Sequence, residues 1–406
     1  MNYRDVIRQY PAILAFGFIA IFSGNLGQTF LVGYFQPAIS EAFSLSSGQF
    51  GIAYSLLTLT SGFLIFFIGP MLDWIPPRRF AAFVVLGMSL GILLLTLSPW
   101  LGAALAGLGL IRFCGQGLFT HLGTTTVAKQ VPAARGSALA LVTLAMPLGE
   151  AVLPSITTGA LQLVSWRELL WALLGILLTV WLPLLARTPL GPASAAETPR
   201  DAPRATGRSP RPLMDTRFWR LSLMMLSIAI VNTGIFVFQS ELTAEFGAGP
   251  AVFALGFALA ASGRVIGSLA AGRLVDRLGA SVMGRVYLLP LVAGLLIAIA
   301  LENGYGILAY MLLSGLVTGM QEPTVTSLLI QLWGSDNLAR LRSVFSAGMV
   351  FASGLAPAFF GMMLDAGVAF ATILALMAGM VTLGWLLAWK PLKAAAGAQA
   401  SRQLTR

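Results

Sequence analysis

The sequence predicts an all-α membrane protein with twelve transmembrane helices in two pseudo-symmetric six-helix bundles. Hydrophobic residues make up 57% of the 406 residues and charged residues only 10%, whereas a soluble domain carries about 25% charged residues. The chain divides into about twelve apolar stretches, each near the roughly 20 residues that a helix needs to cross a bilayer. A short charged motif also recurs once in each half of the chain.

Short polar loops separate the apolar stretches. The expected spans are 11–35, 48–70, 79–98, 101–127, 136–163, 168–186, 218–240, 250–272, 282–301, 305–332, 342–364 and 368–389. Residues 187–216 are rich in Pro, Ala and Arg and poor in large apolar residues, which predicts a disordered cytoplasmic linker. This linker divides the chain into an N-terminal bundle (1–186), a C-terminal bundle (217–390) and a cytoplasmic tail (391–406). A flexible tether is its expected role, with a regulatory or lipid-binding role as the alternative.

The net charge of +10 indicates membrane topology rather than nucleic-acid binding. With these spans, 22 of the 25 Lys and Arg residues fall on the side of the two termini. Arg167 alone falls on the far side, and Arg112 and Arg264 lie within spans. Because cytoplasmic loops carry the excess of basic residues, we expect both termini in the cytoplasm and the protein in a bacterial-type inner membrane. Attraction to anionic lipid is a secondary effect of the same charges.

Several function classes are excluded by the residues that are missing. Cys114 is the only cysteine, which excludes intrachain disulfides and argues against a metal–thiolate cluster. No phosphate-binding G-x-x-x-x-G-K-[ST] loop occurs, so this chain cannot itself drive transport with ATP. No nucleophile–base pair or metal constellation indicates an enzyme, and we expect neither a cofactor nor a metal.

The charged motif after the second span recurs after the eighth. Residues 69–79 read G-P-M-L-D-W-I-P-P-R-R, and residues 272–279 read G-R-L-V-D-R-L-G. The two glycines, like the two aspartates, are 203 positions apart. Six-span repeats related by an axis along the membrane normal are a known transporter design, in which one half rocks against the other. The duplicated loop therefore predicts a two-half transporter with alternating access.

On these motifs the chain resembles the major facilitator superfamily over essentially its whole length. The two charged loops resemble that family's signature between spans two and three and its echo between spans eight and nine. L-I-R-F-C-G-Q-G at 110–117 is similar to the family's fourth-span arginine motif, and A-M-P-L-G-E at 145–150 loosely resembles the fifth-span motif of antiporters. V-A-K-Q-V-P-A-A-R-G-S-A-L-A at 127–140 and A-S-G-R-V-I-G at 261–267 resemble the monocarboxylate and oxalate/formate branch.

The resemblance implies that the two loops form a cytoplasmic gate. Each aspartate would face the start of a helix in the other half, one near Ser343 and the other near Gly136. A carboxylate gains about 0.3–1 kcal/mol at a helix N-terminus, so such contacts would hold the gate shut while the outside is open. A plain topology anchor is the alternative. The expected gating residues are Gly69, Asp73, Arg79, Gly272, Asp276 and Arg277.

Arg264 is the leading candidate for binding the substrate. An unpaired cation within an apolar span is costly and is a functional hypothesis by default, and arginine can hold a carboxylate through two parallel hydrogen bonds. A structural ion pair is the alternative. Polar and aromatic residues of spans one and seven are expected to line the cavity, unless they serve in helix–helix contacts. They are Asn25, Gln28, Thr29, Tyr34, Asn232, Phe236 and Gln239.

Four residues are candidates for proton coupling. Glu150 and Glu322 are acids within spans five and ten, where burial raises a carboxyl's affinity for protons; pairing with a buried arginine is their alternative role. The resemblance implies that Arg112 serves proton coupling or helix packing, and the alternative is to hydrogen-bond backbone carbonyls where helices are broken. His121, the only histidine, titrates in the range of a proton relay, with a structural hydrogen bond as the alternative.

The sequence thus predicts a monomeric secondary transporter that moves a small organic anion, such as a monocarboxylate, together with a proton. Its partners would be this small-molecule substrate, protons and membrane lipid, but no nucleic acid. Proton-coupled efflux of hydrophobic compounds is the main alternative. A non-transporting receptor or scaffold of the same fold is a weaker one, because a static scaffold has no need of two gates.

Overall fold

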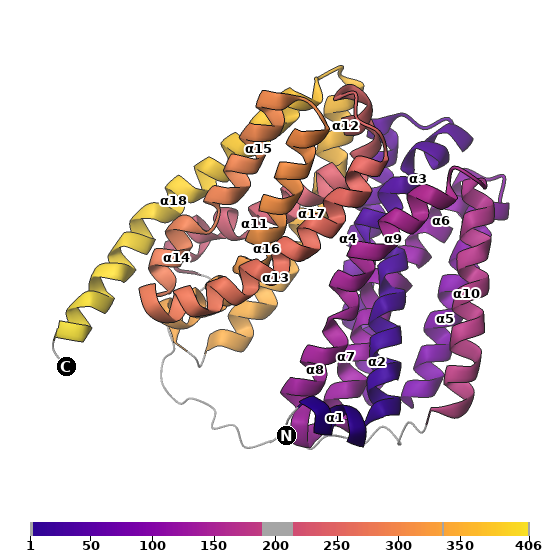
Figure 1. Cartoon of the computed structure of the whole chain (residues 1–406), viewed down its shortest axis with the longest axis horizontal. Helices are drawn as coiled ribbons and strands as arrows, with labels where there is room; N and C mark the ends of the chain where they lie inside the picture. The colour runs from indigo at the N-terminus through magenta and orange to yellow at the C-terminus, as the bar shows by residue number, and fades with distance from the viewer. Residues whose placement is uncertain (1–2, 189–213, 335–336, 405–406) are drawn as a thin grey trace. The chain divides into compact units, whose positions relative to one another are not determined.

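The chain forms two compact units, Met1–Arg200 and Asp201–Arg406. The computed structural model describes residues 3–188, 214–334 and 337–404. Within these residues every regular element is a helix (Figure 1). The predicted disordered linker, 187–216, lies mostly outside the described residues.

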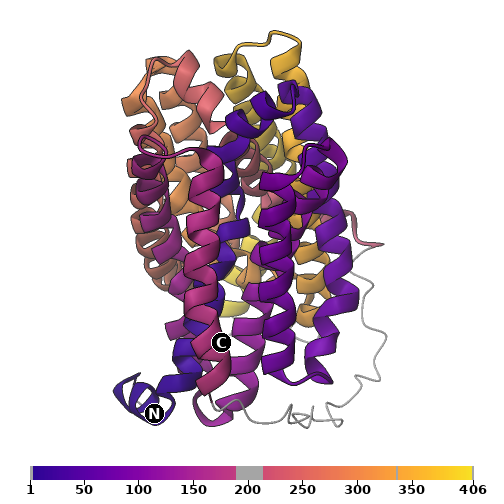
Figure 2. The same ribbon diagram turned by 90° about the vertical axis from the view of Figure 1, so that its right-hand side faces the viewer.

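The first unit holds six long helical segments, and several of them consist of two or three consecutive helices. Figure 2 shows these segments running side by side. The elements are α1 (Tyr3–Gln9), α2 (Pro11–Gly24), η1 (Asn25–Gly27), α3 (Thr29–Ala42), α4 (Ser47–Ile68), η2 (Gly69–Asp73), α5 (Pro77–Leu97), α6 (Leu101–Arg112), η3 (Phe113–Phe119), α7 (Thr120–Gln130), η4 (Pro132–Ala134), α8 (Arg135–Thr143), α9 (Ala145–Ala160) and α10 (Trp166–Arg187).

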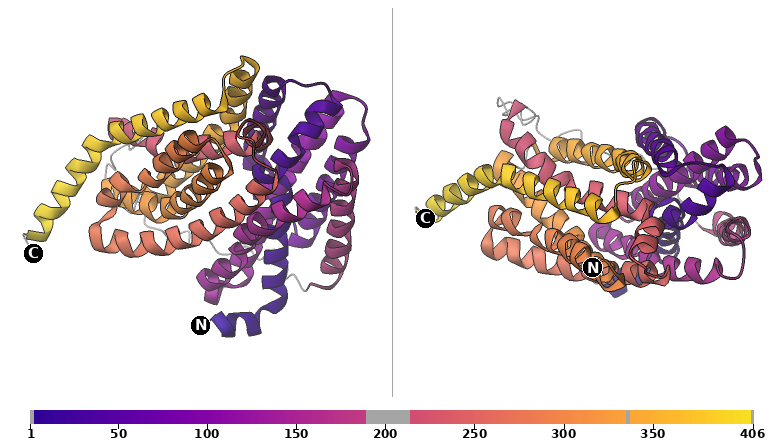
Figure 3. Two further views of the ribbon diagram at one scale, coloured as in Figure 1. Left: turned by 45° about the horizontal axis from the view of Figure 1, so that its top comes forward. Right: turned by 90° about the horizontal axis from the view of Figure 1, so that it is seen from above.

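The second unit holds the other six long segments. The elements are α11 (Thr216–Val237), α12 (Gln239–Glu245), α13 (Ala251–Leu278), α14 (Ala280–Val286), α15 (Leu289–Leu301), α16 (Gly304–Trp333), α17 (Leu338–Asp365) and α18 (Phe370–Leu404). The last helix, α18, runs without interruption for 35 residues (Figure 3).

Eleven segments of the described residues are long and apolar enough to cross a membrane. The remaining long helix, α16, has 30 residues and is outside this group. Gln321 and Glu322 interrupt its apolar sequence and lower its hydropathy. It occupies the place of the tenth expected span, 305–332. The all-helical membrane fold of two six-helix bundles is therefore confirmed.

Small residues set the closest helix contact of the second unit, between α13 and α16. Gly263 and Gly267 of α13 lie against Gly315 and Gly319 of α16. A Cβ atom on Gly315 would lie 2.1 Å from a main-chain oxygen of α13, and one on Gly267 would lie 2.1 Å from a main-chain oxygen of α16. Pairs of small residues four apart permit such backbone contact in membranes, where no hydrophobic force drives helices together.

The fifth span of the first unit is divided by a proline. Helix α8 ends at Thr143 and α9 begins at Ala145. Pro147 has no N–H to donate to the Thr143 carbonyl, and its ring crowds that oxygen. Helix α8 thus ends four residues before the proline, which leaves Leu144 as the joint between the two helices.

Candidate functional site

The helix of the first span is interrupted in its middle. The interruption leaves main-chain polar groups without helical partners, so residues of other spans must bind them. Helix α2 ends at Gly24, a short 3₁₀ turn covers Asn25–Gly27, and Gln28 is extended (φ −75°, ψ 149°) before α3 begins at Thr29. The Gln28 N–H donates to the Asn25 carbonyl at 3.1 Å. Because the helix does not continue, the Gly27 carbonyl has no donor four residues along the chain.

Arg112 of the fourth span supplies the missing donor. Its Nη1 donates to the Gly27 carbonyl at 3.0 Å and to Thr29 Oγ1 at 3.0 Å, and its Nε donates to Thr58 Oγ1 at 3.2 Å. The guanidinium carbon lies 4.7 Å from the ring centroid of Tyr54, whose hydroxyl donates to Thr29 at 3.3 Å. Arg112 is only 1% exposed. The arginine thus ties spans one, two and four together at the break.

The charge of Arg112 is held without a carboxylate. Among the described residues Arg112 forms no ion pair, and its Nη2 atom is buried without a hydrogen-bond partner. A cation within a membrane is costly, so the hydroxyls, the carbonyl and the Tyr54 ring must solvate it instead. The helix changes to a π-helix directly after Arg112, over Phe113–Phe119. Such wide turns often occur at functional sites.

Glycines allow the broken first span to approach the π-helix. A Cβ atom on Gly27 would lie 2.3 Å from the Ile111 carbonyl oxygen and 2.8 Å from the Gly115 Cα. A Cβ atom on Gly115 would lie 2.5 Å from the Gly27 nitrogen. Only glycine fits at either position, because the colliding atoms belong to the main chain.

Asn25 links the same break to the fifth span. Its side-chain amide donates to the carbonyls of Phe22 (3.0 Å) and Ala145 (3.3 Å) and is 0% exposed. A Cβ atom on Gly149 would lie 2.1 Å from the Asn25 amide nitrogen. Asn25 and Thr29 therefore serve in helix–helix contacts within the first unit, the alternative role given to the polar residues of this span. Gln28 and Tyr34 are half-buried.

The first copy of the repeated motif is fixed by α7. Lys129 Nζ lies 2.5 Å from Asp73 Oδ1 and 3.4 Å from the Leu72 carbonyl. His121 Nε2 donates to the Gly69 carbonyl at 3.0 Å, which requires the proton to be on Nε2. His121 therefore binds the first residue of η2, and Lys129 binds the last. Arg79 is exposed near the start of α5.

The second copy of the motif is not the loop that the sequence predicts. Helix α13 continues through Gly272, Asp276 and Arg277 to Leu278. In the first copy Pro70 interrupts the helix, because it cannot donate to the carbonyl four residues earlier; the second copy has no proline there. Asp276 and Arg277 are exposed, and Asp276 forms no ion pair within the described part of the chain.

Comparison with known proteins places the chain in a family. The sequence model of the Major Facilitator Superfamily matches residues 17–239, more than half of the chain. The chain belongs to the Major Facilitator Superfamily. No curated protein matches its sequence. Two solved structures of a bacterial homologue of the human lysosomal transporter Spinster share the fold.

The two Spinster-homologue structures are both inward-facing. The unoccupied one has a TM-score of 0.66 and 15% identity and is aligned over 95% of this chain and 93% of its own. The occupied one has a TM-score of 0.65 and 18% identity, over 98% of this chain and 97% of its own. As a superfamily member, the protein is an integral membrane transporter of small molecules that works by alternating access, and it is not an enzyme.

In this transporter the candidates of span seven lie on α11 and just after it. Asn232 Oδ1 accepts hydrogen bonds from the Tyr310 hydroxyl and from Ser314 Oγ, both at 2.7 Å. Phe236 packs against Phe257 with ring centroids 4.9 Å apart. Gln239 is 2% exposed. Asn232 thus connects spans seven and ten, as Asn25 connects spans one and five.

The structure corrects the expectation that Glu322 is buried. Its side chain is 61% exposed and forms an ion pair with Arg342 of α17. Arg342 Nη1 also donates to Thr326 Oγ1 at 3.2 Å. Polar neighbours one turn along α16 and on α17 therefore hold this acid. Arg264 and Glu150 are both half-buried, on α13 and α9 respectively.

Sequence reasoning missed three residues of these sites. Tyr54 and Thr58 complete the Arg112 site, and Lys129 pairs with Asp73. The signal for the first two was present, because they are polar residues four apart in an apolar span and so lie on one helix face. In the described residues no group of three or more His, Cys, Asp or Glu is placed to hold a metal ion.

Proposed function

We propose that this transporter moves a small organic anion, such as a monocarboxylate, together with a proton. The observation that carries the proposal is Arg264, which lies half-buried near the middle of α13. A planar guanidinium binds a carboxylate through two parallel hydrogen bonds. Ionisable groups within membrane spans usually mark substrate or ion pathways.

The helix contact of α13 explains how Arg264 is held. Its neighbour Gly263 lies in the stripe of small residues that meets α16, and a Cβ on Gly319 would lie 2.0 Å from the Arg264 carbonyl oxygen. The main chain at Arg264 is thus fixed by close packing. A fixed backbone gives a binding side chain a defined origin, which helps to orient a small ligand.

We assign the coupling proton to Glu150, with Glu322 as the alternative. An acid that carries a proton between two sides must be shielded from water while access changes. Glu150 is half-buried on α9, six residues after the joint at Leu144, whereas Glu322 is exposed. Because Glu150 and the joint lie in the same span, protonation of Glu150 would be linked to movement of span five.

The proposal includes topology and assembly. The excess of basic residues at the termini and in alternate loops supports both termini in the cytoplasm, in a bacterial-type inner membrane. The transporter would act as a monomer, because each chain already holds both six-helix units. The Asp73 and Asp276 motifs would act at the cytoplasmic gate.

External pH in lightly buffered proteoliposomes tests the function. We expect the outside to become alkaline when a small carboxylate is added, with passive entry corrected by empty liposomes. Arg264→Ala should abolish this change, and Glu150→Gln should uncouple it from uptake. Acidification on addition of a hydrophobic cation would instead establish proton-coupled efflux and refute the anion proposal.

A further inference from the structure

An apolar groove follows α2 on one side of the first unit. One pocket of about 510 Å³ lies between α2, α9 and α10, and a second of about 560 Å³ lies between α1, α2 and α8. Phe18 and Ile19 line both pockets, so the two form one continuous groove. Ile156 and Ile176 on its rim are 54% and 60% exposed, so the groove is open along its side. We call it the α2 groove.

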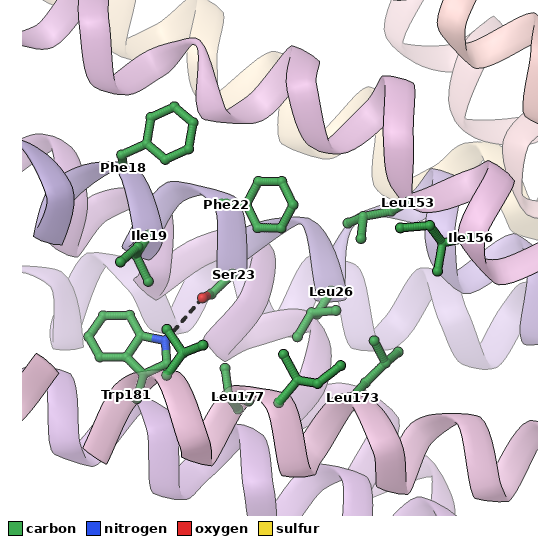
Figure 4. A pocket seen from close by; sticks show the side chains of 12 residues that line it. Phe18, Ile19, Phe22, Ser23, Leu26, Leu153, Ile156, Leu173, Leu177 and Trp181 are labelled. Atoms are coloured by element: carbon green, nitrogen blue, oxygen red, sulfur yellow. Dashed lines mark hydrogen bonds between the residues drawn. The ribbon is translucent and has the colours of Figure 1, made fainter. Parts of the chain in front are cut away.

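The wall of the α2 groove offers almost only hydrocarbon. Ser23 and Trp181 carry the polar atoms within the first pocket (Figure 4), and Trp181 Nε1 donates to Ser23 Oγ at 3.0 Å. This bond uses the only N–H of the Trp181 side chain, and Ser23 is only 8% exposed, so little polar surface is left for a ligand. The groove therefore accepts an apolar chain and excludes charged or strongly polar groups along its length.

The α2 groove is long enough to hold a lipid chain. Its lining along the first span extends from Pro11 of α2 to Leu26 of η1. At 1.5 Å per residue the helical part from Pro11 to Ser23 rises about 18 Å. One leaflet contributes about half of the roughly 30 Å hydrocarbon core. A chain that enters at α1 would thus extend slightly beyond the bilayer midplane.

Exposed basic residues lie on the elements at the α1 end of the α2 groove. Ile7 of α1 lines the groove, while Arg4 and Arg8 on the same short helix are exposed. Val6 of α1 is fully buried and packs with Ala138 of α8 in one core cluster. This packing fixes α1 at the start of α8, where Arg135 is also exposed. Three arginines and Asp5 therefore give this end a net positive charge.

We infer that the α2 groove binds one acyl chain of an anionic phospholipid from the leaflet that α1 faces. Inside a bilayer every apolar surface is already covered by lipid, so the groove alone gives little preference. The preference must come from the polar end, where the arginines of α1 and Arg135 attract an anionic headgroup. The site lies outside the transport route proposed above and does not depend on it.

The position of the groove suggests what the lipid does. Leu144, the joint between α8 and α9, lines the second pocket. A chain in the groove contacts this joint and stabilises one arrangement of span five. Lipid composition would then alter the transport rate without any contact between lipid and substrate.

Native mass spectrometry of the full chain tests the inference, with phosphatidylglycerol and phosphatidylcholine of identical acyl chains as probes. We expect one phosphatidylglycerol to remain bound in preference to phosphatidylcholine. Arg4→Gln with Arg8→Gln should lower this preference about fivefold for each arginine. Ile19→Trp fills the shared part of the groove and should abolish retention of the lipid.

Leu90→Trp is the matched control, because Leu90 on α5 is 51% exposed and lies outside the groove. It should retain the lipid as the wild type does. Protection of the buried Cys114 thiol shows that each variant is folded. No preference for phosphatidylglycerol in the wild type, or equal retention by folded Ile19→Trp and Leu90→Trp, would overturn the inference.

Discussion

Gly27→Ala is the sharpest test of the contact between the broken first span and the π-helix. The new Cβ would lie 2.3 Å from the Ile111 carbonyl oxygen, 2.8 Å from the Gly115 Cα and 2.9 Å from the Gln116 nitrogen. All three are main-chain atoms, so no side-chain rotation relieves the collision. The two spans must move apart, which also separates Arg112 from the Gly27 carbonyl.

The expected cost follows from the kind of atoms involved. Overpacking a core costs about 1–3 kcal/mol, occasionally more, and a main-chain collision belongs at the upper end of that range. Alanine gains back about 0.4–1 kcal/mol by restricting the unfolded chain. Units of about 150–250 residues change melting temperature by about 2–4 °C per kcal/mol. The net cost of about 2–2.6 kcal/mol therefore predicts a loss of about 4–10 °C for the first unit.

The single cysteine provides the assay. Cys114 is 1% exposed and lies beside Gly115 in the π-helix, so a thiol-reactive dye reports unfolding of this region during heating. Gly175→Ala is the matched control, because it lies within α10 and a Cβ there meets nothing within 4 Å. Gly175→Ala should leave the melting temperature unchanged or raise it slightly. If Gly27→Ala melts together with Gly175→Ala, the proposed close contact is wrong.

Three further predictions concern other parts of the molecule. Lys129→Gln removes a partly exposed ion pair with Asp73, so stability should fall by only about 0–1 kcal/mol while the uptake rate in proteoliposomes falls clearly; unchanged uptake would contradict a gating role. Hydrogen bonds from the Arg217 guanidinium hold the pKa of the Asp215 carboxyl below its ordinary value of 3.8. The stabilisation from this shift is therefore complete above pH 3.8 and is lost as the pH falls below it. Asp215→Asn should therefore flatten the loss of melting temperature below about pH 4; an unchanged loss in that range would refute this. Gly267→Ala should lower the melting temperature followed by tryptophan fluorescence, while Gly379→Ala, which meets nothing within 4 Å, should not; equal melting of the two would argue against the packing of α13 on α16.

The membrane spans could be predicted from the sequence because segments that cross a bilayer must be long and apolar. The tenth expected span, 305–332, agrees closely with α16 (Gly304–Trp333). The extensions beyond the membrane could not be predicted in the same way. Helix α18 continues to Leu404 because its Ala-rich sequence favours helix, although it is no longer apolar.

The partners of the buried polar groups could not be predicted from the sequence. Arg112 and Gly27 are 85 positions apart in the chain, and nothing local indicates that one solvates the other. The break at Gln28 lies where two distant spans approach closely, whereas the joint at Leu144 lies three residues before Pro147, which the sequence does show. Glu322 was expected to be buried because it lies in an apolar helix, but position along a helix does not tell which face is covered by other helices.

Solute counterflow with a labelled small monocarboxylate tests the central claim, that Arg264 holds the substrate's carboxylate. Proteoliposomes loaded with unlabelled substrate should accumulate label without any proton gradient, which separates binding from proton coupling. We expect Arg264→Ala to abolish accumulation and Arg264→Lys to retain a part of it at higher substrate concentration, because lysine keeps the charge but loses the paired hydrogen bonds. Arg220→Ala, which removes an exposed cation at the start of α11, should accumulate label as the wild type does. Accumulation by Arg264→Ala equal to that of Arg220→Ala would contradict the account.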